Sequence, residues 1–507
     1  MPDLVIDFVN MTMNTTLSKD KVLPPQFVEV KNAELAESGS FRKRKGINDW
    51  TTDNPSASNV NAIAPLYLKT SANITVFAIA DNEVWFVTSD GGSWTQEGGG
   101  NLTGSVTPHQ ISWGMFLDTT LKSSLYFSHI TTGVIRVGDT DWLKLGGATF
   151  TQAACAEYFL NKLFVGKTVE SGVTYGNRLR WSITSDDNDW TGTGSGFFPV
   201  SLSGSGTVTN ASGITGLRVY RDRLWIGTDT TLHVLTGTTS NTFGADYVRT
   251  QNFVNGATMY ETGGFLWYVD RDGIWQFNGT TAINVVSNNM HDKWVALDDA
   301  NDILKATASW DDENGIYRVF FPAVVEEWSY YYRTGRWAIR TFNTANNIRV
   351  ISPPYAHKNV KPSPYFLGTI TDGKVYSYPT VVGTTLQDDG NAITASFTTG
   401  KLHLGSLAEQ PESEAAITDI WVDYVEQAAA AVTLTMDVEV DGTSITQQTI
   451  TIADAGASDD DFPTQQRMPL PAETLSGRYF EFKFQDATDA VRCDIRKVII
   501  RYELENR

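Results

Sequence analysis

Sulfur chemistry and export signals are scarce in this chain. Two cysteines occur among 507 residues, Cys155 and Cys493, so a disulfide framework is excluded and reduced, buried thiols are expected. The opening residues, MPDLVIDFVNMTMN, lack a basic segment followed by an apolar one, and no secretory signal is expected. No apolar run approaches the roughly 18 residues of a membrane-spanning helix.

Positive charge is also in short supply. The chain has 39 Lys and Arg against 58 Asp and Glu, a net charge of −19. Proteins that grip nucleic acid use clustered basic residues, so that class is excluded. The one basic cluster, Arg42 to Lys45, is expected to be a solvated or interface-facing turn. Residues 391–507 are especially acidic, with 20 Asp and Glu against 9 Lys and Arg.

The residue groupings that carry catalysis are missing as well. The six histidines are dispersed, and no Gly-x-Ser-x-Gly elbow, phosphate loop or dinucleotide fingerprint occurs. The acid pairs Asp311-Asp312, Glu326-Glu327 and the run Asp459 to Asp461 are expected in turns or solvent. We therefore predict no catalytic residue, no cofactor, no metal and no small-molecule substrate, and hence a protein that is not an enzyme.

One arginine-based alternative stays open. A sialidase-type site needs several arginines around one carboxylate, and pairing with acids at strand edges is the more ordinary role of blade arginines. The arginines that could supply such a site are Arg178, Arg180, Arg218, Arg221, Arg223 and Arg271.

Aromatic residues and glycine are abundant. Aromatics make up 12% of the chain, including 15 Trp, and there are 42 Gly. This composition favours short strands joined by tight turns. We predict an all-β protein with at least ~45% strand and under ~10% helix.

A repeated unit spans the middle of the chain. It consists of an aromatic-containing strand, a polar turn, and a second strand with an aromatic, and it recurs at intervals typical of propeller blades. We predict a β-propeller over residues 56–385, with six to eight blades and seven as the best estimate. The anchor aromatics of the units are Trp85, Tyr126, Phe164, Trp225, Trp267, Tyr317 and Phe366.

The stretch TSDGGSW, Thr88 to Trp94, is similar to the Asp box of sialidases and related propellers. An Asp followed by two Gly forms a turn, and the Trp covers its base with apolar area. We interpret it as a folding motif of a blade, with a sugar-binding edge as the alternative.

One interval between units is longer because of a Gly-, Ser- and Thr-rich insertion, Thr191 to Gly213. Its large residues, Phe197 to Val200, lie together in the middle. Two interpretations remain: a loop that projects toward a channel or a neighbouring subunit, and a blade-edge loop that packs its Phe pair locally.

The two ends differ from the propeller. Residues 1–55 mix Pro, a short strand-like stretch and the basic cluster, which predicts an arm lying against the propeller or a neighbour. Residues 391–507 contain cleanly alternating strands such as AVTLTMDVEV, followed by the turn Asp441-Gly442. This pattern predicts a C-terminal β-sandwich domain.

The layout resembles the tail nozzle, or hub, proteins of short-tailed bacteriophages, also described as packaged-DNA stabilisation or tail tubular proteins. In the segment NAELAESGSFRKRKG, the residues Asn32, Gly39, Arg44 and Gly46 fit the family's N-terminal motif, although Lys45 stands where Pro is frequent. The segments NRLRWSITSDDNDW, GGFLWYVDRDGIWQFNG and WSYYYRTGRW resemble the family's blades.

This resemblance implies a virion structural protein, made in the host cytoplasm and located in the tail. It implies a homo-hexamer that contacts a tail adaptor ring and tail fibres or spikes, closes the DNA channel, and releases the genome during ejection. An acidic lumen would repel the phosphates of the passing DNA without specific binding. The alternative is a carbohydrate-binding or carbohydrate-cleaving propeller, such as a receptor-binding or depolymerase component.

Overall fold

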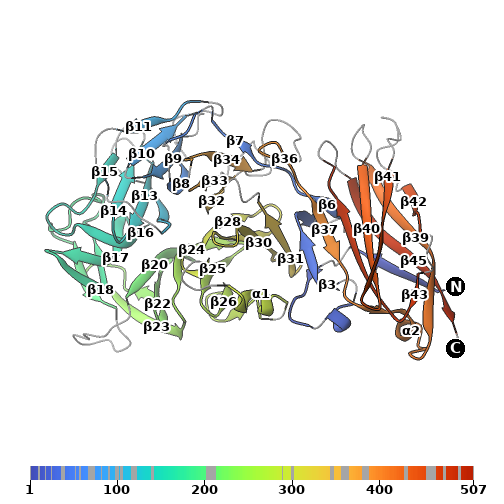
Figure 1. Ribbon diagram of the computed structural model, residues 1–507. Helices are drawn as coiled ribbons and strands as arrows, with labels where there is room; N and C mark the ends of the chain where they lie inside the picture. Colours follow the sequence, from blue (N-terminus) through green and yellow to red (C-terminus); the bar gives the residue numbers. More distant parts are fainter. Residues whose placement is uncertain are drawn as a thin grey trace.

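The computed structural model in Figure 1 is almost entirely β-structure, with 62% strand and 3% helix, which confirms the predicted fold class. A ring of blades forms one end of the molecule and a two-sheet domain the other, and both chain termini lie at the two-sheet end. The structure describes residues 2–8, 12–17, 19–23, 26–35, 40–51, 53–55, 59–66, 75–81, 83–88, 92–97, 102, 107–115, 123–138, 142–200, 213–287, 289–297, 302–342, 347–354, 365–370, 372–378, 387–426, 432–452, 464–471, 475–488 and 493–505.

The described strands form seven four-stranded antiparallel groups, within the predicted range of six to eight blades. The strands of each blade are given from the inner strand outward. Blade 1 contains β8 (Val60–Leu66), β9 (Thr75–Ala80), β10 (Glu83–Val87) and β11 (Thr95–Glu97); blade 2 contains β12 (Gln110–Met115), β13 (Ser123–His129), β14 (Gly133–Val137) and β15 (Trp142–Lys144); blade 3 contains β16 (Gln152–Phe159), β17 (Lys162–Glu170), β18 (Val173–Trp181) and β19 (Gly196–Pro199); and blade 4 contains β20 (Ile214–Tyr220), β21 (Arg223–Thr228), β22 (Thr231–Thr236) and β23 (Gly244–Thr250). Blade 5 contains β24 (Asn255–Thr262), β25 (Phe265–Asp270), β26 (Gly273–Phe277) and β27 (Ala282–Asn284); blade 6 contains β28 (Thr307–Asp311), β29 (Ile316–Phe321), β30 (Glu326–Tyr331) and β31 (Arg336–Thr341); and blade 7 contains β32 (Ile348–Ile351), β33 (Tyr365–Thr369), β34 (Val375–Tyr378) and β7 (Asn48–Asp49).

The blades close into a ring because the inner strands of blades 2 to 7 contact one another in sequence. Strand β8 of blade 1 contacts β13 of blade 2 on one side and β32 and β33 of blade 7 on the other. The outer strand of blade 7 comes from the N-terminal segment, since β7 pairs with β34 through Asp49 opposite Tyr376. The last blade is therefore built from both ends of the propeller sequence. Each blade buries apolar residues against its neighbours, as expected of units that cannot bury both faces alone.

Two further sheets face each other as the predicted sandwich, with buried apolar residues between them. One sheet contains β42 (Thr464–Met468), β39 (Glu414–Glu426), β45 (Cys493–Glu505), β6 (Phe41–Lys43) and β5 (Ala33–Leu35), with β1 (Asp3–Asp7) on β45 and β43 (Ser476–Gly477) on β39. The other contains β4 (Glu29–Lys31), β37 (Ala395–Thr398), β44 (Tyr479–Asp486), β40 (Val432–Val440) and β41 (Thr443–Ile452), with β38 (Leu402–His403) on β44.

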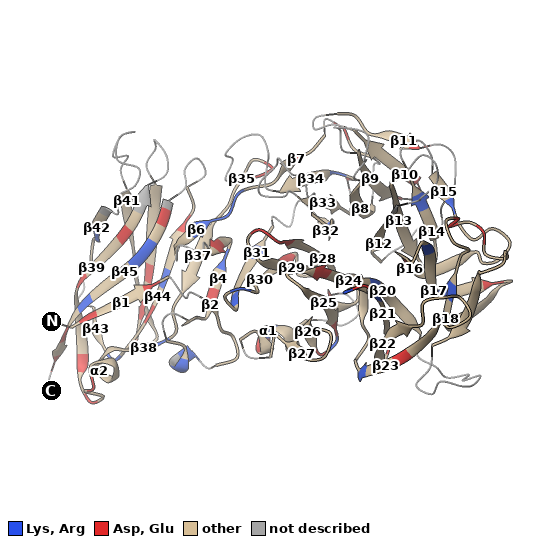
Figure 2. Cartoon of the chain, turned by 180° about the vertical axis from the view of Figure 1, so that it is seen from behind, with Lys and Arg blue, Asp and Glu red and all other residues tan. Residues whose placement is uncertain are grey.

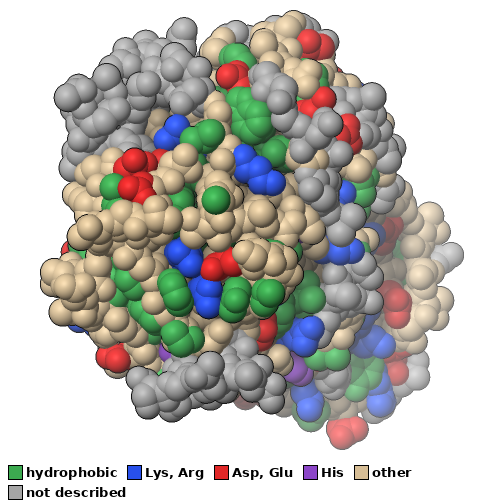
Figure 3. Space-filling model, turned by 90° about the vertical axis from the view of Figure 1, so that its left-hand side faces the viewer, with side chains coloured by type: hydrophobic (Ala, Val, Ile, Leu, Met, Phe, Trp, Pro, Cys, Tyr) green, Lys and Arg blue, Asp and Glu red, His purple; other side chains and the backbone are tan. Residues whose placement is uncertain are grey.

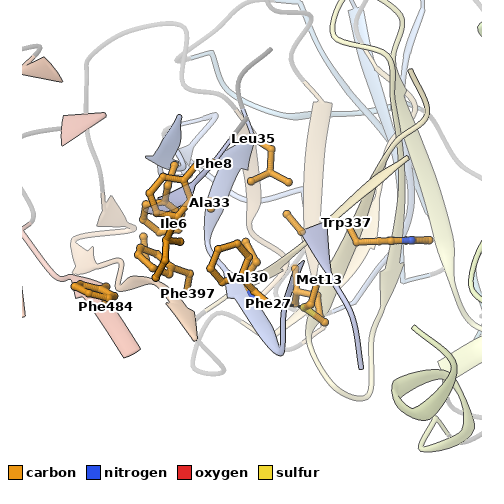
Figure 4. Close-up of a cluster of buried hydrophobic side chains, with 14 of the residues drawn as sticks. Ile6, Phe8, Met13, Phe27, Val30, Ala33, Leu35, Trp337, Phe397 and Phe484 are labelled. Atoms are coloured by element: carbon orange, nitrogen blue, oxygen red, sulfur yellow. Dashed lines mark hydrogen bonds between the residues drawn. The ribbon is translucent and has the colours of Figure 1, made fainter. Parts of the chain in front are cut away.

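The N-terminal segment links the two halves. Strand β4 pairs with β31 of blade 6 on one side, Lys31 opposite Ile339, and with β37 of the sandwich on the other. Blade 6 and one sandwich sheet therefore form a continuous ten-stranded sheet. Phe8 and Phe27 fill the sandwich core against Phe397, whose ring centroid lies 4.8 Å from that of Phe8 (Figure 4). The predicted arm is thus part of both cores.

The remaining elements are short, and in the part of the chain that the structure describes no helix is long and apolar enough to cross a membrane. They are β2 (Thr12–Met13), β3 (Gln26–Phe27), β35 (Gln387–Asp388), β36 (Asn391–Ala392), the 3-10 turn η1 (Lys19–Lys21), α1 (His291–Val295) and α2 (Leu404–Leu407).

The expectation of a solvated turn at Arg42 to Lys45 is wrong, because Arg42 and Lys43 belong to strand β6 and three of the four cations pair with acids. Arg42 pairs with Asp494, Lys43 lies 3.9 Å from Asp486, and Arg44 pairs with Asp388. Lys43 and Arg44 are fully buried. The acids that neutralise these cations lie more than 300 positions away in the sequence, so a local reading could not pair them.

Three of the four motif residues of the same segment, Asn32, Arg44 and Gly46, meet at one junction, and Gly39 lies outside the described residues. Asn32, at φ 51°, accepts hydrogen bonds through Oδ1 from Arg44 Nε (3.1 Å) and from the backbone N–H of Thr341 (2.9 Å). Arg44 also donates to the carbonyl of Thr341 (2.9 Å). A Cβ on Gly46 would lie 1.8 Å from the carbonyl oxygen of Gln387, so only glycine fits there.

Blade packing holds Phe198 and Val200 of the insertion, whereas Phe197 is 50% exposed, with Arg178 and Arg180 over its ring. Phe197 and Phe198 belong to β19, which pairs with β18, and the ring of Phe198 lies 5.7 Å from that of Trp181. Val200 is buried. Residues 201–212 lie outside the described residues, so the prediction of a projecting loop is untested there.

The Asp-box-like stretch connects β10 to β11, in the hairpin where a folding motif is expected. Trp94 is buried, and it donates from its backbone N–H to Asp53 (2.9 Å) and from its indole to Thr51 (2.9 Å). The turn residues 89–91 lie outside the described residues. Trp94 thus attaches blade 1 to the N-terminal segment.

Removal of Arg44 is expected to destabilise the whole subunit. Arg44→Ala would leave Asp388 buried without its cation, which costs about 3–5 kcal/mol of unfolding free energy. The control is Arg501→Ala, because Arg501 pairs with Asp3 at the surface, both side chains being more than 40% exposed. That change should cost less than about 1 kcal/mol. Denaturant titration measures both, and equal losses would contradict the assignment.

Candidate functional site

Inner strands of four blades bring polar side chains together at the centre of the propeller. Glu157 comes from β16, Arg218 from β20, Gln110 from β12 and Tyr260 from β24. Glu157 and Arg218 are each 5% exposed. Glu157 and Arg218 are the only charged residues of their strands, and they are opposite in charge.

Arg218 organises this centre. Its Nη1 lies 3.3 Å from Oε2 of Glu157, and its Nη2 donates to the carbonyl of Ile111 at 2.8 Å. Its guanidinium carbon lies 4.5 Å from the ring centroid of Tyr260. In return, the side-chain amide of Gln110 donates to the carbonyl of Leu217. One arginine therefore contacts blades 2, 3 and 5 from its position in blade 4.

Aromatic rings extend the filled centre. The ring of Tyr260 lies 4.5 Å from that of Trp310 on β28, and Trp113 on β12 donates its indole N–H to the carbonyl of Pro65 on β8 (3.1 Å). Side chains from five blades, together with the Pro65 carbonyl of a sixth, thus lie around the axis. They occupy the space between the inner strands of blades 2 to 6.

In the Glu157–Arg218 pair, burial has the largest effect on the pKa of the carboxyl. It raises the pKa of Glu157 to about 7, although Arg218 and the backbone N–H of Val219 act to lower it. Burial also raises the pKa of Tyr260 to about 12. A carboxyl with such a pKa can gain or lose a proton near neutrality, which is the property of a general acid or of a pH-sensitive contact.

The two acid pairs, Asp311-Asp312 and Glu326-Glu327, both lie in blade 6, where Asp311 and Glu327 form ion pairs with buried arginines. Glu327 is fully buried, 3.1 Å from Arg340 and 3.7 Å from Arg318, and it accepts a hydrogen bond from the hydroxyl of Tyr365. Asp311 lies 3.2 Å from Arg318. These acids neutralise arginines and hold blades 6 and 7 together. Asp459 to Asp461 lie outside the described residues.

The six arginines do not converge on one carboxylate. Arg178 and Arg180 share Glu170 at 2.6 and 2.9 Å. Their strand, β18, lies at the left of Figure 1, and Figure 3 views this end of the propeller, where basic and hydrophobic side chains lie side by side. Arg218 pairs with Glu157 at the centre. Arg221 donates to backbone carbonyls, Arg223 begins β21 as an exposed residue, and Arg271 stacks over Phe253.

Four of the described histidines, His109, His129, His233 and His403, form hydrogen bonds within the fold. His109 and His129 have ring centroids 5.2 Å apart, and burial lowers the pKa of His129 to about 4. His403 caps α2 by accepting the backbone N–H of Ser406. His357 lies outside the described residues. Within the described ranges, no group of three or more His, Cys, Asp or Glu could hold a metal ion.

Sequence reasoning named Arg218 only as one of six arginines and missed Glu157 altogether. A usable signal was present, since each is the only charged residue of a short, mostly apolar strand, QAACAEYF or ITGLRVY. A lone charge in such a strand needs an opposite charge nearby. The pairing across blades follows only from the ring geometry.

No protein-family model and no curated protein matches the sequence. Solved structures match at the level of the fold. They include the β-propeller domain of Cps50 (Swd1) from Myceliophteria thermophila (10% identity over 66% of this chain and 98% of that one, TM-score 0.40), virginiamycin B lyase from Staphylococcus aureus (9%, 65% and 97%, 0.39) and YCF48 bound to D1 peptide (8%, 67% and 96%, 0.39). Such similarities concern the fold and say nothing of function.

The raised pKa of Glu157 makes a definite prediction for stability. The Glu157 carboxyl has a pKa of about 7 in the native state and its ordinary value of 4.5 in the unfolded chain. The unfolding free energy therefore falls by about 3 kcal/mol as pH rises from the lower value to the higher one, because the native state must lose a proton that it holds more tightly. Glu157→Gln should match the wild type at pH 5 and be more stable at pH 8.

Urea titrations of both proteins at the two pH values test this prediction. Burial raises the pKa values of Asp187 and Asp270 to about 6, so these residues also lower the unfolding free energy as pH rises. Because they are present in both proteins, their effect cancels in the comparison. A Glu157→Gln variant that is less stable than the wild type at pH 8 would show that ion pairing with Arg218 outweighs burial.

Proposed function

We propose that this protein is a structural subunit of a phage tail, a nozzle or hub that assembles as a hexamer, closes the DNA channel at the distal tail end and releases the genome during ejection. One observation carries the proposal. The motif residues that connect the chain to this family, Asn32, Arg44 and Gly46, occupy the junction that ties the propeller to the sandwich. The resemblance therefore involves residues that specify the architecture.

The mechanical character of the subunit supports this role. A ten-stranded sheet runs from blade 6 through β4 into the sandwich, and the N-terminal segment also completes blade 7. Backbone hydrogen bonds thus resist separation of the two domains. A subunit that contains packaged DNA under pressure requires such a connection, whereas a mobile binding module does not.

The filled propeller axis indicates where DNA would pass. Arg218, Tyr260 and Trp113 occupy the centre of the ring, so a duplex cannot pass through one propeller. The channel would lie between subunits, with their outer surfaces as its wall. Figure 2 shows Asp and Glu on both domains, and a net charge of −19 per subunit would repel the phosphates of DNA that slides past.

Electron microscopy of the purified chain, alone and with a tail adaptor ring protein, tests the proposal directly. We expect sixfold rings that dock onto the adaptor. Monomers at every salt and adaptor concentration would overturn it. The carbohydrate alternative is tested in parallel by incubation with bacterial surface polysaccharide, where release of reducing ends that Glu157→Gln abolishes would favour a depolymerase over a nozzle.

The charge of the subunit predicts how the hexamer responds to salt. Six subunits of −19 repel one another, and screening becomes effective as the Debye length falls to about 10 Å near 0.1 M salt. The hexamer should therefore become more stable as salt rises to moderate concentration. Sedimentation velocity across a salt series measures the hexamer fraction, and steady dissociation with added salt would show that ion pairs between subunits dominate instead.

A further inference from the structure

The turn Ile130–Thr132 joins β13 to β14, and it also attaches blade 2 to blade 3. The carbonyl of Thr131 accepts a hydrogen bond from the side-chain amide of Gln152 on β16 (3.0 Å). His129, which ends β13, lies opposite Ala153 of the same strand. The β13–β14 turn therefore lies where the second blade contacts the third.

Two histidines hold adjacent threonines of this turn. The backbone N–H of Thr131 donates to Nδ1 of His129 (3.1 Å), and the hydroxyl of Thr131 lies 2.7 Å from the same nitrogen. Nε2 of His129 forms a hydrogen bond with the hydroxyl of Thr107. His109, which precedes β12, has its Nε2 2.8 Å from the hydroxyl of Thr132. The two ring centroids are 5.2 Å apart, so the histidines form one cluster.

The hydrogen bond from Thr131 determines the protonation state of His129. A backbone N–H can only donate, so Nδ1 of His129 must present a lone pair. An imidazolium carries a proton on both ring nitrogens and cannot accept this bond. Protonation of His129 therefore breaks the contact that positions the turn.

The surroundings of the two rings also oppose protonation. Burial, assisted by Lys167 on β17, lowers the pKa of His129 to about 4. Burial lowers the pKa of His109 well below its ordinary value, and His129 and Arg349 on β32 act in the same direction, against a hydrogen bond with the backbone of Asn61 on β8. Lys167 and Arg349 are both cations, so a proton on either ring adds positive charge near positive charge.

We propose that the β13–β14 turn is an acid-sensitive latch between blades 2 and 3, which is closed while His109 and His129 are neutral and is released when they take up protons. Release breaks the hydrogen bond from Thr131 and places two like charges in one buried cluster. Opening is local because both histidines contact this one turn. The latch is a property of the subunit and does not depend on the proposed tail function.

Acid favours the open latch because the open state binds the proton more tightly. An opened turn exposes His129 to water, where its pKa returns to the ordinary value of 6.5. The latch is therefore fully stable above pH 6.5 and loses stability as pH falls toward 4. Between pH 7 and pH 5, the protection of the turn against hydrogen exchange should fall about 20-fold.

Hydrogen exchange of the full chain, followed by mass spectrometry at pH 5, 6 and 7 and corrected for intrinsic exchange rates, tests the latch. Amides of residues 129–134 should lose this protection in acid, while β40 in the sandwich keeps its own. His129→Asn should abolish the loss, because Asn accepts the N–H of the residue two positions on and takes up no proton. His291→Asn makes the same change at an exposed histidine in α1 and should leave the wild-type loss in place.

His109→Gln tests the second ring, since it removes one titrating group while keeping a polar partner for Thr132, and it should reduce the loss of protection. A wild-type turn that stays protected at pH 5 would overturn the proposal, as would an equal loss in His129→Asn. If His129→Asn does not fold, the wild type decides the question, because β40 provides the reference within the same molecule.

Discussion

The buried guanidinium of Arg44 is the interaction on which the arrangement of the two domains depends. Its nitrogens donate to Asn32, Asp388, the carbonyl of Thr341 and its own neighbour's carbonyl, so that three distant parts of the chain meet around one cation. A cation removed from water is tolerated only when all its partners are in place. The N-terminal segment, blade 6 and β35 must therefore all be in place before the charge of Arg44 can be buried. Strands β4 and β7, which flank this residue in the sequence, are held in register on both domains as a result.

The same physical solution recurs at three buried arginines. Arg218 lies over Tyr260 at the propeller axis, Arg340 over Tyr378 in the blade 6–7 contact, and Arg44 over Phe342 at the junction, each within about 5 Å of the ring centroid. An aromatic face attracts a guanidinium and replaces part of its lost hydration. The high aromatic content thus serves two purposes, since the rings pack between blades and also solvate buried arginines.

Sequence periodicity predicted the propeller because its strongest signal lies where the fold repeats. Six of the seven anchor aromatics lie on the second strand of their blades, from Tyr126 on β13 to Phe366 on β33, and Trp85 lies on the third strand of blade 1. The sequence could not reveal β7, since two residues carry no periodicity. The prediction of a solvated turn at Arg42 to Lys45 failed because four consecutive cations normally require water. In the folded chain, acids from the C-terminal part of the sequence neutralise three of them instead. The Glu157–Arg218 pair was missed for the same reason.

Internal pairing leaves the acidic excess of the chain unchanged. Lys43, Arg44, Arg218, Arg318 and Arg340 are each at most 5% exposed, and each faces a buried acid, so these pairs contribute nothing to the net surface charge. Because burial withdraws acids and cations in equal numbers, the excess of −19 remains with the other residues of the chain. Copies of such a subunit can approach closely only where charge is locally absent or compensated.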